Sequence, residues 1–594
     1  MYDKKEVYMK RKVFFLFEKS RKIKAAATFL IFATILPVFS APRGAQELVP
    51  AGSWVYDALT AVALESGIVQ FTDCAPLTIS EIKSYLYEID YDSLSKGGKA
   101  QYDRINDYFN QSSKSLDSDF LSVGFSPSLN PESYWKSNDD IAWVYDRYER
   151  KPVIDLPLTI SGRDYFTMYT DLYLGQNQCK MAHDDTYVNL PFVPDDIDIN
   201  FPHVGYGSTG LKFTDTCGLS FQLGMGPVSV GRTQTGSIIM SEYMTQASYG
   251  QLSLYSTNFR YSMLVSQLNV DKYMYTHRLD FRFFKKLTFS VLESTLTNAE
   301  MELRYLNPLT VYHGAAPWRD YTVTDEDDSD SHNGEFLGIS IQYVPVKNVR
   351  LYALYAMNQF QTPYENSNFD SKTPNSLGGQ AGLEAYIPAK DGYFHFAAEG
   401  YYANPYLYIK QSPDWSFCRT YEENIGDKDP FYEWMGSPFG PDSIAFNLEL
   451  GYEKPGKWAV DFKYLYLCQG ELSGTNAFKN LEGWGGTDVY AEMEDGVAKN
   501  WPYPSQTNGL NQFAITPTGT PQYTNKLSIK GTWYASKTLS FTAQPSYVII
   551  LNNNNQSGKT EWGIERLCKK PSTDSSIPFK CCKEYFDFCN GKRN

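Results

Sequence analysis

The stretch from Met274 to Leu296 constrains the fold of this chain more than any other. From Arg278 to Phe283 charged and apolar side chains alternate, and after Lys285-Lys286 the alternation resumes from Leu287 to Val291. A period of two on both sides of a short polar link is typical of a β-hairpin. A soluble sandwich with its polar face in water would show the same alternation, so the arrangement of such hairpins along the chain has to decide.

Hairpins of this kind recur along the chain with a constant asymmetry between their connections. Short turns are expected at 346–348, 390–392, 454–456 and 536–537, and long connections at 297–336, 358–377, 404–441 and 469–523. Strands of about 9–11 residues joined alternately by short turns and long loops are typical of outer-membrane barrels. A closed barrel also leaves no unpaired strand edge in lipid. We therefore predict an all-β, antiparallel transmembrane barrel of about 16–18 strands.

Composition supports a membrane barrel and excludes one class of partner. The chain has 594 residues, of which 16% are aromatic, with 46 Tyr, 36 Phe and 11 Trp. Barrels use such residues as girdles at both membrane interfaces, so outer-membrane lipid is an expected partner. The formal net charge of −14 argues against nucleic acid, whose phosphates require a basic surface.

The beginning of the chain resembles a leader for export. Basic residues from Arg21 to Lys24 precede an apolar run from Ala25 to Phe39, which ends beside Ser40. The run is about 15 residues long, short of the ~20 that a membrane-spanning helix needs. We predict a signal peptide at 1–40, Sec-type export, and location in the outer membrane of a bacterium with two membranes.

Residues 41–117 are expected to form a small helical domain in the periplasm. An apolar stripe from Trp54 to Leu64 ends before Gly67, a typical helix stop. Thr78 and Glu81 have the spacing of a capping box. The sequence leaves two roles open for this domain, packing against the barrel or binding of periplasmic partners.

The barrel is expected to occupy residues 118–566, and the chain beyond it departs from the strand pattern. Residues 567–594 lose the alternation and contain four of the nine cysteines. We interpret this tail as the product of a frameshift or truncation that leaves the final strand incomplete. A genuine tail with thiols for metal or disulfide chemistry is the alternative.

No catalytic or metal-binding pattern stands out. The six histidines lack ligand spacing, and no phosphate-binding glycine loop or nucleophile elbow is present. We therefore expect no enzymatic activity, no cofactor and no metal site. His277 and His395 are interpreted as lumen-facing. Charged residues on the polar parity of the strands are expected to line the lumen, either along a pore or within a plugged interior: Arg278, Asp280, Arg282, Glu384, Glu399, Glu449, Asp461, Lys463 and Lys530.

Five tryptophans lie in the predicted long loops among Tyr, Asn and Asp residues. Aromatic faces beside amide side chains suit sugars, because the rings offer apolar area and the amides bind hydroxyls. Packing within the loops or a girdle at the membrane interface would explain the same residues. The candidate glycan-binding residues are Trp318, Trp415, Trp434, Trp484 and Trp501.

Three stretches carry a resemblance to a known family: 220–254, 277–294 and 301–314. They resemble the Wzi family of outer-membrane capsule-assembly proteins, particularly its spirochaete-type members, and residues 49–69 fit the helical domain of that family. The resemblance implies an 18-stranded monomeric barrel, plugged or narrow, placed by the barrel-assembly machinery. Where family members often have Trp-Gly-Pro-Gly after Gly-Arg, this chain continues from Arg232 with Thr233 to Gly236.

The resemblance and the residues together leave three functions to weigh. The first is binding of surface polysaccharide through the extracellular loops, without catalysis. The second is a porin-like channel for passive uptake of small solutes, with lumen charges that set selectivity. The third is a surface adhesin or a structural barrel.

Overall fold

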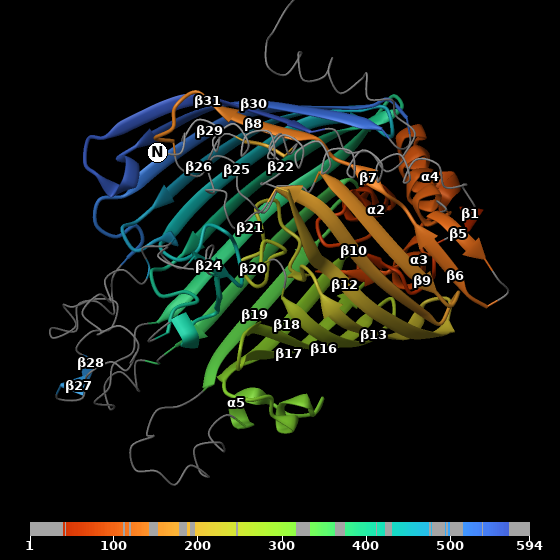
Figure 1. Ribbon diagram of the computed structural model, residues 1–594, viewed down its shortest axis with the longest axis horizontal. Helices are drawn as coiled ribbons and strands as arrows, with labels where there is room; N and C mark the ends of the chain where they lie inside the picture. The colour runs from red at the N-terminus through yellow and green to blue at the C-terminus, as the bar shows by residue number, and fades with distance from the viewer. Residues whose placement is uncertain are drawn as a thin grey trace, which may run out of the picture.

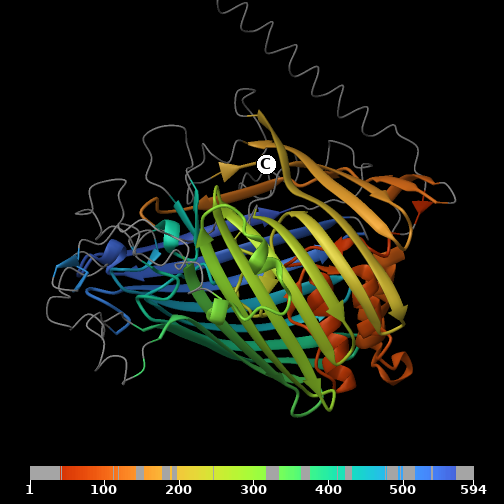
Figure 2. The ribbon, with the colours of Figure 1, turned by 90° about the horizontal axis from the view of Figure 1, so that it is seen from below.

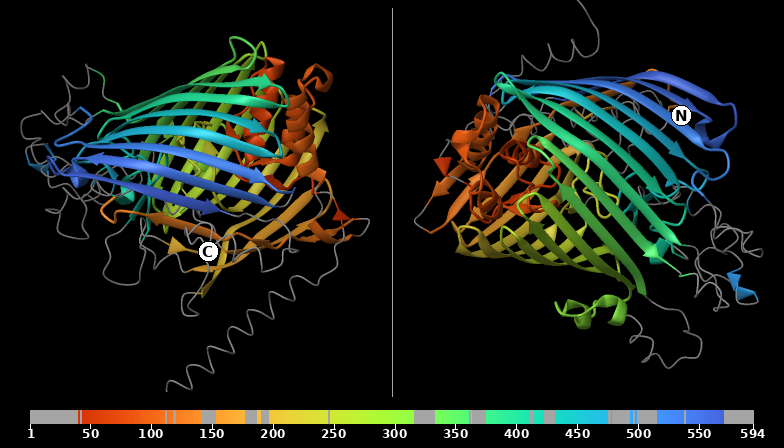
Figure 3. Two further views of the ribbon diagram at one scale, coloured as in Figure 1. Left: turned by 90° about the horizontal axis from the view of Figure 1, so that it is seen from above. Right: turned by 180° about the vertical axis from the view of Figure 1, so that it is seen from behind.

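A computed structural model of the chain shows a β-barrel with helices inside one end (Figures 1 and 3). It describes residues 40–41, 43–110, 113–117, 120–141, 153–176, 187–189, 197–244, 247–315, 333–360, 362, 375–410, 413–421, 431–474, 477, 493–494, 497–498, 515–536 and 539–569. Except for Ser40, the predicted signal peptide lies outside these residues.

The wall of the barrel is a closed ring of antiparallel strands. Among the described residues it contains eighteen strands when β6 (Ser122–Phe125), β7 (Ser128–Leu129) and β8 (Glu132–Lys136) count as one. The others, in order around the ring, are β9 (Ile154–Ser161), β10 (Phe166–Gln176), β12 (Ile197–Thr214), β13 (Cys217–Met225), β15 (Ser248–Tyr255), β16 (Phe259–Asn269), β17 (Lys272–Phe283), β18 (Leu287–Asn298), β19 (Asn333–Tyr343), β20 (Val349–Gln359), β21 (Ser376–Ala389), β22 (Gly392–Ala403), β25 (Ser443–Lys454), β26 (Trp458–Gln469), β29 (Gln522–Tyr534), β30 (Ser540–Leu551) and β31 (Thr560–Lys569). The predicted fold class is confirmed, with the strand number that the resemblance implies.

The ring closes where the first wall segment meets the last strand. In β6 and β7 the first segment pairs with β9, and in β8 it pairs with β31 from Glu132 opposite Lys569 to Lys136 opposite Glu565. On its other edge β31 pairs with β30 along its whole length. The expectation of an incomplete final strand with a boundary at 566 is therefore wrong, because the ladder runs through Lys569. Residues 570–594 lie outside the described residues.

Alternation along the strands separates a polar inner face from an apolar outer face. On β17, Arg278 is 3% exposed and Asp280 is fully buried, while Phe283 on the other parity is 45% exposed. Large apolar side chains project outward all around the wall, as lipid requires, and polar ones project into the lumen. The hairpin predicted around 274–296 is confirmed with its strands paired from Lys272 to Asn298.

The two ends of the barrel differ, and we call them the short-turn end and the long-loop end. At the short-turn end, β17 joins β18 through residues 284–286, and Phe284 and Lys285 adopt positive φ angles of 54° and 58°. Such angles give the tight twist that suits a hairpin. The four predicted short turns lie at this end, and the long connections 299–332, 360–375, 404–442 and 470–521 lie at the other. This asymmetry is confirmed.

The N-terminal helices lie at the short-turn end (Figure 1). They are α2 (Trp54–Ser66), α3 (Ile79–Leu86), η1 (Tyr91–Ser93) and α4 (Lys96–Asn110). The hydroxyl of Ser53 caps the start of α2, and Gly67 ends it in the left-handed region with φ 75°. At α3 the hydroxyl of Thr78 accepts from the amide of Glu81, half of the predicted capping box. Within the described residues, we find no helix with the length and apolarity needed to cross a membrane.

The remaining short elements belong to the connections. They are β1 (Ser40–Ala41), β2 (Leu48–Val49), β3 (Cys74–Ala75), β4 (Leu77–Thr78), β5 (Ser113–Asp117), β11 (Tyr187–Val188), β14 (Ser229–Val230), η5 (Leu303–Leu306), α5 (Tyr312–Ala315), η6 (Pro413–Trp415), β23 (Cys418–Tyr421), β24 (Phe431–Trp434), β27 (Met493–Glu494), β28 (Val497–Ala498) and η11 (Asn553–Asn555).

Candidate functional site

The helical region fills the short-turn end of the lumen through buried ion pairs with the wall. The guanidinium of Arg278 on β17 bonds to Asp73 and also to Asp280, the latter at 2.6 Å. Asp73 accepts a second bond, at 2.9 Å, from the hydroxyl of Ser340 on β19. These side chains are almost fully buried. One carboxylate of the helical region thus bonds to two wall strands at once.

Three further ion pairs repeat this arrangement around the ring. Arg282 contacts both carboxylate oxygens of Glu88, at 2.8 and 2.6 Å. Arg260 of β16 faces Glu81 of α3 at 3.6 Å, and neither side chain is exposed. Burial raises the pKa of Glu81, and the positive charge of Arg260 opposes this shift. Arg104 of α4 pairs with Glu453 of β25 at 2.8 Å.

The connection between β13 and β15, residues 226–247, fills the middle of the lumen. Its strand β14 pairs with β3 of the helical region. Gly231 and Gly236 have φ angles of 91° and 94°, which a residue with a Cβ rarely adopts. Between them, Arg232 binds Asp57 and Thr60 of α2, each at 2.6 Å. This connection therefore joins the helices to the wall.

Two glutamates of the wall hold this connection in place. Glu399 on β22 accepts from the backbone amides of Gln234 and Thr235, at 2.8 and 3.1 Å. Glu384 on β21 lies 3.4 Å from Arg232 and 3.0 Å from Arg350. Both carboxylates are almost fully buried, so their partners come from the protein. Their role in the structure is to fix the lumen filling.

The connection 404–442 enters the lumen from the long-loop end. Tyr408 and Trp434 are buried and their rings stack with centroids 6.1 Å apart. Met435 accepts from the amide of Ser241, which joins this connection to residues 226–247. Burial lowers the pKa of Lys410 to about 8, although nearby Glu335 acts in the opposite direction. The lumen is thus filled from both ends among the residues that the structure describes.

The five candidate tryptophans fall into two groups. Trp415 is 8% exposed and Trp434 is 5% exposed, and both belong to the packed connection 404–442. Their rings are covered by protein, so in this conformation they present no face to a sugar. Trp318, Trp484 and Trp501 lie outside the described residues. A glycan-binding role of this set remains a prediction.

The nine predicted lumen residues all lie on the inward parity but differ in accessibility. Six are buried beneath the helices and the two inserted connections: Arg278, Asp280, Arg282, Glu384, Glu399 and Glu449. Three on β26 and β29 are only half-buried: Asp461, Lys463 and Lys530. Asp461 is opposite Lys530 in the ladder, and Lys463 lies 2.8 Å from Glu449. Among these nine residues, the accessible charge therefore lies on one side of the lumen.

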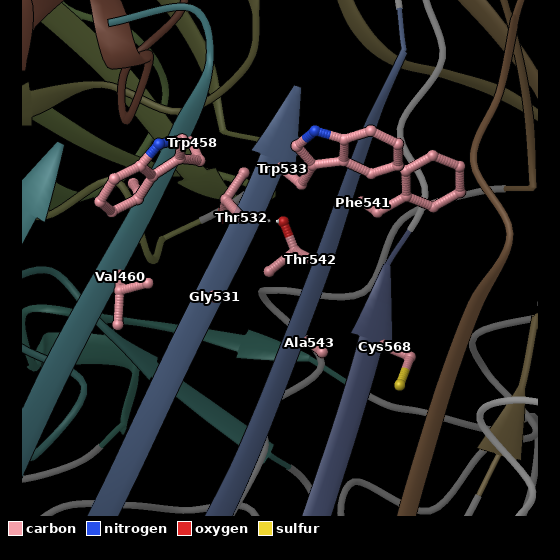
Figure 4. A pocket seen from close by; sticks show the side chains of 10 residues that line it. Trp458, Val460, Gly531, Thr532, Trp533, Phe541, Thr542, Ala543 and Cys568 are labelled. Carbon is pink, nitrogen blue, oxygen red and sulfur yellow. Dashed lines mark hydrogen bonds between the residues drawn. The ribbon is translucent and has the colours of Figure 1, made fainter. Parts of the chain in front are cut away.

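A groove on the outer wall crosses β26, β29, β30 and β31 (Figure 4). It runs over Gly531, where no side chain intervenes, and is flanked by Trp458, Trp533 and Phe541. These residues lie on the outward parity. An apolar groove on the lipid-facing surface is suited to acyl chains and does not suit a soluble solute.

Two aspects of the site differ from what the sequence predicts or indicates. The partners of the lumen charges in the helical region, such as Asp73 and Glu88, carry no sequence signal, since about two hundred residues separate them from Arg278 and Arg282. The predicted lumen position of His277 is wrong: the structure places it on the outward parity, packed against Tyr312 with ring centroids 4.3 Å apart. The inward assignment of His395 agrees with its position 3.6 Å from Glu384.

Comparison with solved structures places this architecture among outer-membrane barrels. The similarity is to Wzi of Escherichia coli, described as an outer-membrane protein involved in group 1 capsule assembly and as a carbohydrate-binding β-barrel, with a TM-score of 0.53, 11% sequence identity, and 90% of this chain and 100% of that chain covered. OprD of Pseudomonas aeruginosa gives a TM-score of 0.33 at 9% identity, with 76% of this chain and 94% of that chain covered. No protein-family model and no curated protein sequence matches the chain. The likeness to Wzi shows the fold.

Proposed function

We propose that this chain is a non-catalytic outer-membrane barrel that binds surface polysaccharide at its long-loop end. The observation that carries the proposal is the filled lumen. Helices, residues 226–247 and residues 404–442 occupy it, and six of its charges are buried, five of them in ion pairs. A barrel filled in this way has its accessible polar surface at the loops, which is where a polymer outside the cell would be met.

The asymmetry between short turns and long connections supports one orientation of the chain in the membrane. Outer-membrane barrels have short turns on the periplasmic side and long loops outside. The short-turn end, with its helices, then faces the periplasm, and the long-loop end, from which the connections 299–332, 404–442 and 470–521 start, faces the exterior. The similarity in fold to a carbohydrate-binding barrel supports the choice of a glycan as the ligand.

The glycan surface is proposed to lie on the exterior loops, with Trp318, Trp484 and Trp501 as stacking residues. Exposed aromatic rings bind the apolar faces of sugars, and amide side chains of neighbouring Asn and Gln bind their hydroxyls. Trp415 and Trp434 support the loop from beneath, because they are buried in the connection 404–442. The two groups of tryptophans thus have different expected roles.

The test is binding of purified full-length protein to an array of bacterial capsular and surface polysaccharides. We expect binding to at least one acidic or neutral polymer, and a loss of roughly tenfold in affinity for Trp484→Ala or Trp501→Ala, the size of one stacking contact. Trp533→Ala is the matched control, because its ring is 59% exposed on the outer wall beside the short turn after β29, at the end of the barrel opposite the long loops. Equal loss in all three variants, or no binding to any polymer, contradicts the proposal.

A porin-like channel is the second candidate, and one observation favours it. Asp461, Lys463 and Lys530 are half-buried on one side of the lumen, where a narrow polar path would run. Conductance of the full chain in planar bilayers separates the two functions. Stable ohmic steps of porin size favour the channel, whereas silence from folded, heat-modifiable protein that binds glycan favours the first proposal. A silent barrel that binds no polysaccharide leaves the adhesin or structural function.

A further inference from the structure

A segment of the chain lies outside the barrel, against the wall formed by β16 to β19 (Figure 2). It comprises residues 299–315, which follow β18 and contain η5 and α5. Figure 1 shows the same elements outside the ring. By contrast, the described parts of the connections 226–247 and 404–442 enter the lumen. Residues 299–315, which we call the external segment, instead lie against the outside of the wall.

Hydrogen bonds to three consecutive strands hold the external segment on the wall. The hydroxyl of Tyr261 on β16 donates to the carbonyl of Pro308 at 3.0 Å. The hydroxyl of Tyr275 on β17 accepts from the amide of Glu302 at 3.0 Å. On β18, Glu293 accepts from the amide of His313 at 2.7 Å. The segment therefore has a fixed position and does not project freely into solvent.

Aromatic packing adds to these bonds. Tyr305 and Tyr312 of the segment are fully buried against outward-facing Tyr275 of the wall, which is itself fully buried. The Tyr275 and Tyr305 rings lie 5.0 Å apart, and Tyr312 covers His277 at 4.3 Å. Three buried tyrosines form a sizeable apolar contact, because each buries 150–250 Å² in typical packing.

The wall beneath the segment is unusually polar on its outward face. On β30 the outward parity is apolar from Phe541 to Leu551, roughly 33 Å along the strand, or about 25 Å across the membrane at a tilt of ~40°. That matches the ~25 Å apolar band of outer-membrane barrels. On β18 the outward apolar run covers only Leu287 to Val291, about 10 Å across the membrane by the same estimate. Glu293 follows it on the same parity.

The neighbouring strand shows the same shortfall. On β19 the outward apolar run from Tyr343 to Leu337 spans about 15 Å across the membrane and is followed by Glu335. Part of the band, roughly 10–15 Å in height, is therefore missing from this sector of the wall. The external segment lies over this polar region and bonds to both glutamates through His313.

The face of the segment that points away from the wall carries large apolar side chains. Leu309 is 89% exposed, Leu303 is 81% exposed, Val311 is 65% exposed and Met301 is 51% exposed. The turn around Pro308 reaches the level of Tyr261, which is opposite Leu279 in the ladder and so lies within the apolar run of β17. The apolar face of the segment thus continues the apolar surface of the strands below it.

We propose that the external segment lies in the outer leaflet of the membrane, where its apolar face contacts lipid acyl chains and completes the band that β18 and β19 lack. The polar side chains of the wall are sealed beneath it, away from lipid. The segment's own charges form short pairs, as in Glu302 with Arg304 at 2.7 Å, which suits a membrane interface. This inference depends on the membrane location in the proposed function, and not on glycan binding.

The test is photo-crosslinking of the full chain reconstituted into phosphatidylcholine–phosphatidylglycerol vesicles. The photoreactive residue p-benzoylphenylalanine is placed at Leu309, at Ile529 as a lipid-facing control, and at Tyr87 as a water-facing control on the helices. Adducts are identified by mass spectrometry of the irradiated protein. We expect phospholipid adducts at Leu309 with a yield close to that at Ile529, and at least about tenfold above that at Tyr87.

Each alternative result is distinct. Lipid adducts at Ile529 with none at Leu309 overturn the inference and leave the membrane location intact. Crosslinks between two copies at Leu309 overturn it in favour of a protein interface. No lipid adduct at either position overturns the membrane location and the inference with it.

As a second measurement, Leu309→Glu should lower the urea midpoint for unfolding from vesicles, whereas Val270→Glu, at an 82% exposed position in the β16–β17 turn, should not. Equal midpoints in both variants contradict the inference.

Discussion

Arg282 on the inner wall and Glu88 in the segment after α3 form an ion pair in which one guanidinium nitrogen lies 2.8 and 2.6 Å from the two carboxylate oxygens. Both side chains are nearly inaccessible, with 1% and 9% exposure. Removal of one partner leaves a buried charge without compensation, which typically costs about 3–5 kcal/mol. Substitutions in this pair therefore test whether contacts between the helices and the wall contribute to the free energy of unfolding.

We expect Arg282→Ala and Glu88→Ala each to lower the free energy of unfolding by about 3 kcal/mol, measured by urea unfolding from lipid vesicles. The double variant should lose much less than the sum. Lys285→Ala is the matched control, because Lys285 approaches the same carboxylate at 3.5 Å but is 57% exposed. Its expected cost is below ~1 kcal/mol. An equal loss of unfolding free energy in the Arg282 and Lys285 variants would contradict a stabilising role of the buried ion pair.

The closing seam makes a prediction about chain length. A chain that ends at Glu565 lacks four of the five pairs between β31 and β8, together with the ion pair of Lys569 and Glu132 at 3.0 Å. A chain that ends at Lys569 retains all of them. We expect the longer chain to fold into the heat-modifiable form on denaturing gels and the shorter one to fail, since an open barrel leaves unpaired edges in lipid. Folding of both chains would show that the seam is dispensable.

Lys410 gives a prediction about pH. Burial lowers its pKa to about 8, below the ~10.4 of an exposed lysine, so between these values the unfolded chain binds more protons than the folded one. Stability relative to Lys410→Gln should therefore rise as pH increases from about 8 to ~10, and be flat below. Thermal melts of both proteins across this range measure the difference, which cancels the titration of other groups. A difference that falls with pH would refute the assignment.

A substitution at Trp434 distinguishes a structural role of this side chain from direct contact with the ligand. Its ring is buried against Tyr408, so Trp434→Ala should cost about 3–5 kcal/mol of stability. The affinity of the folded fraction for glycan should stay unchanged. Trp533→Ala, on the outer wall at the short-turn end, should affect neither quantity by much. A variant at Trp434 that is fully stable but loses binding would mean that the loop opens to present this ring.

Strands could be predicted from the sequence where their side chains alternate between the lumen and the lipid-facing surface. Alternation around Arg278 and Leu279 depends only on which face meets lipid, so wall, turns and strand direction could be read without the structure. The position of His277 was misjudged, because a polar residue on the outward parity is tolerated only under a covering segment. That covering depends on Tyr312, thirty-five residues away.

Contacts inside the barrel could not be predicted for a related reason. Arg278 finds Asp73 through the tertiary fold, and an isolated aspartate in a loop carries no period or motif. The final strand was also misread, because Leu567 and Cys568 are both buried at the seam and so break the apparent alternation. Where both faces of a strand are covered by protein, the two-residue period disappears.

The ion pairs of the lumen also bear on the order in which the protein can be assembled. The helical region precedes the wall strands in the chain and is synthesised first, yet its carboxylates are matched by arginines on β16 and β17, and its Arg104 by a glutamate on β25. Before those strands arrive, none of the partners exists. We therefore expect the wall strands to assemble around the helical region before β31 pairs with β8. The N-terminal region is therefore expected to serve as the template around which the barrel assembles.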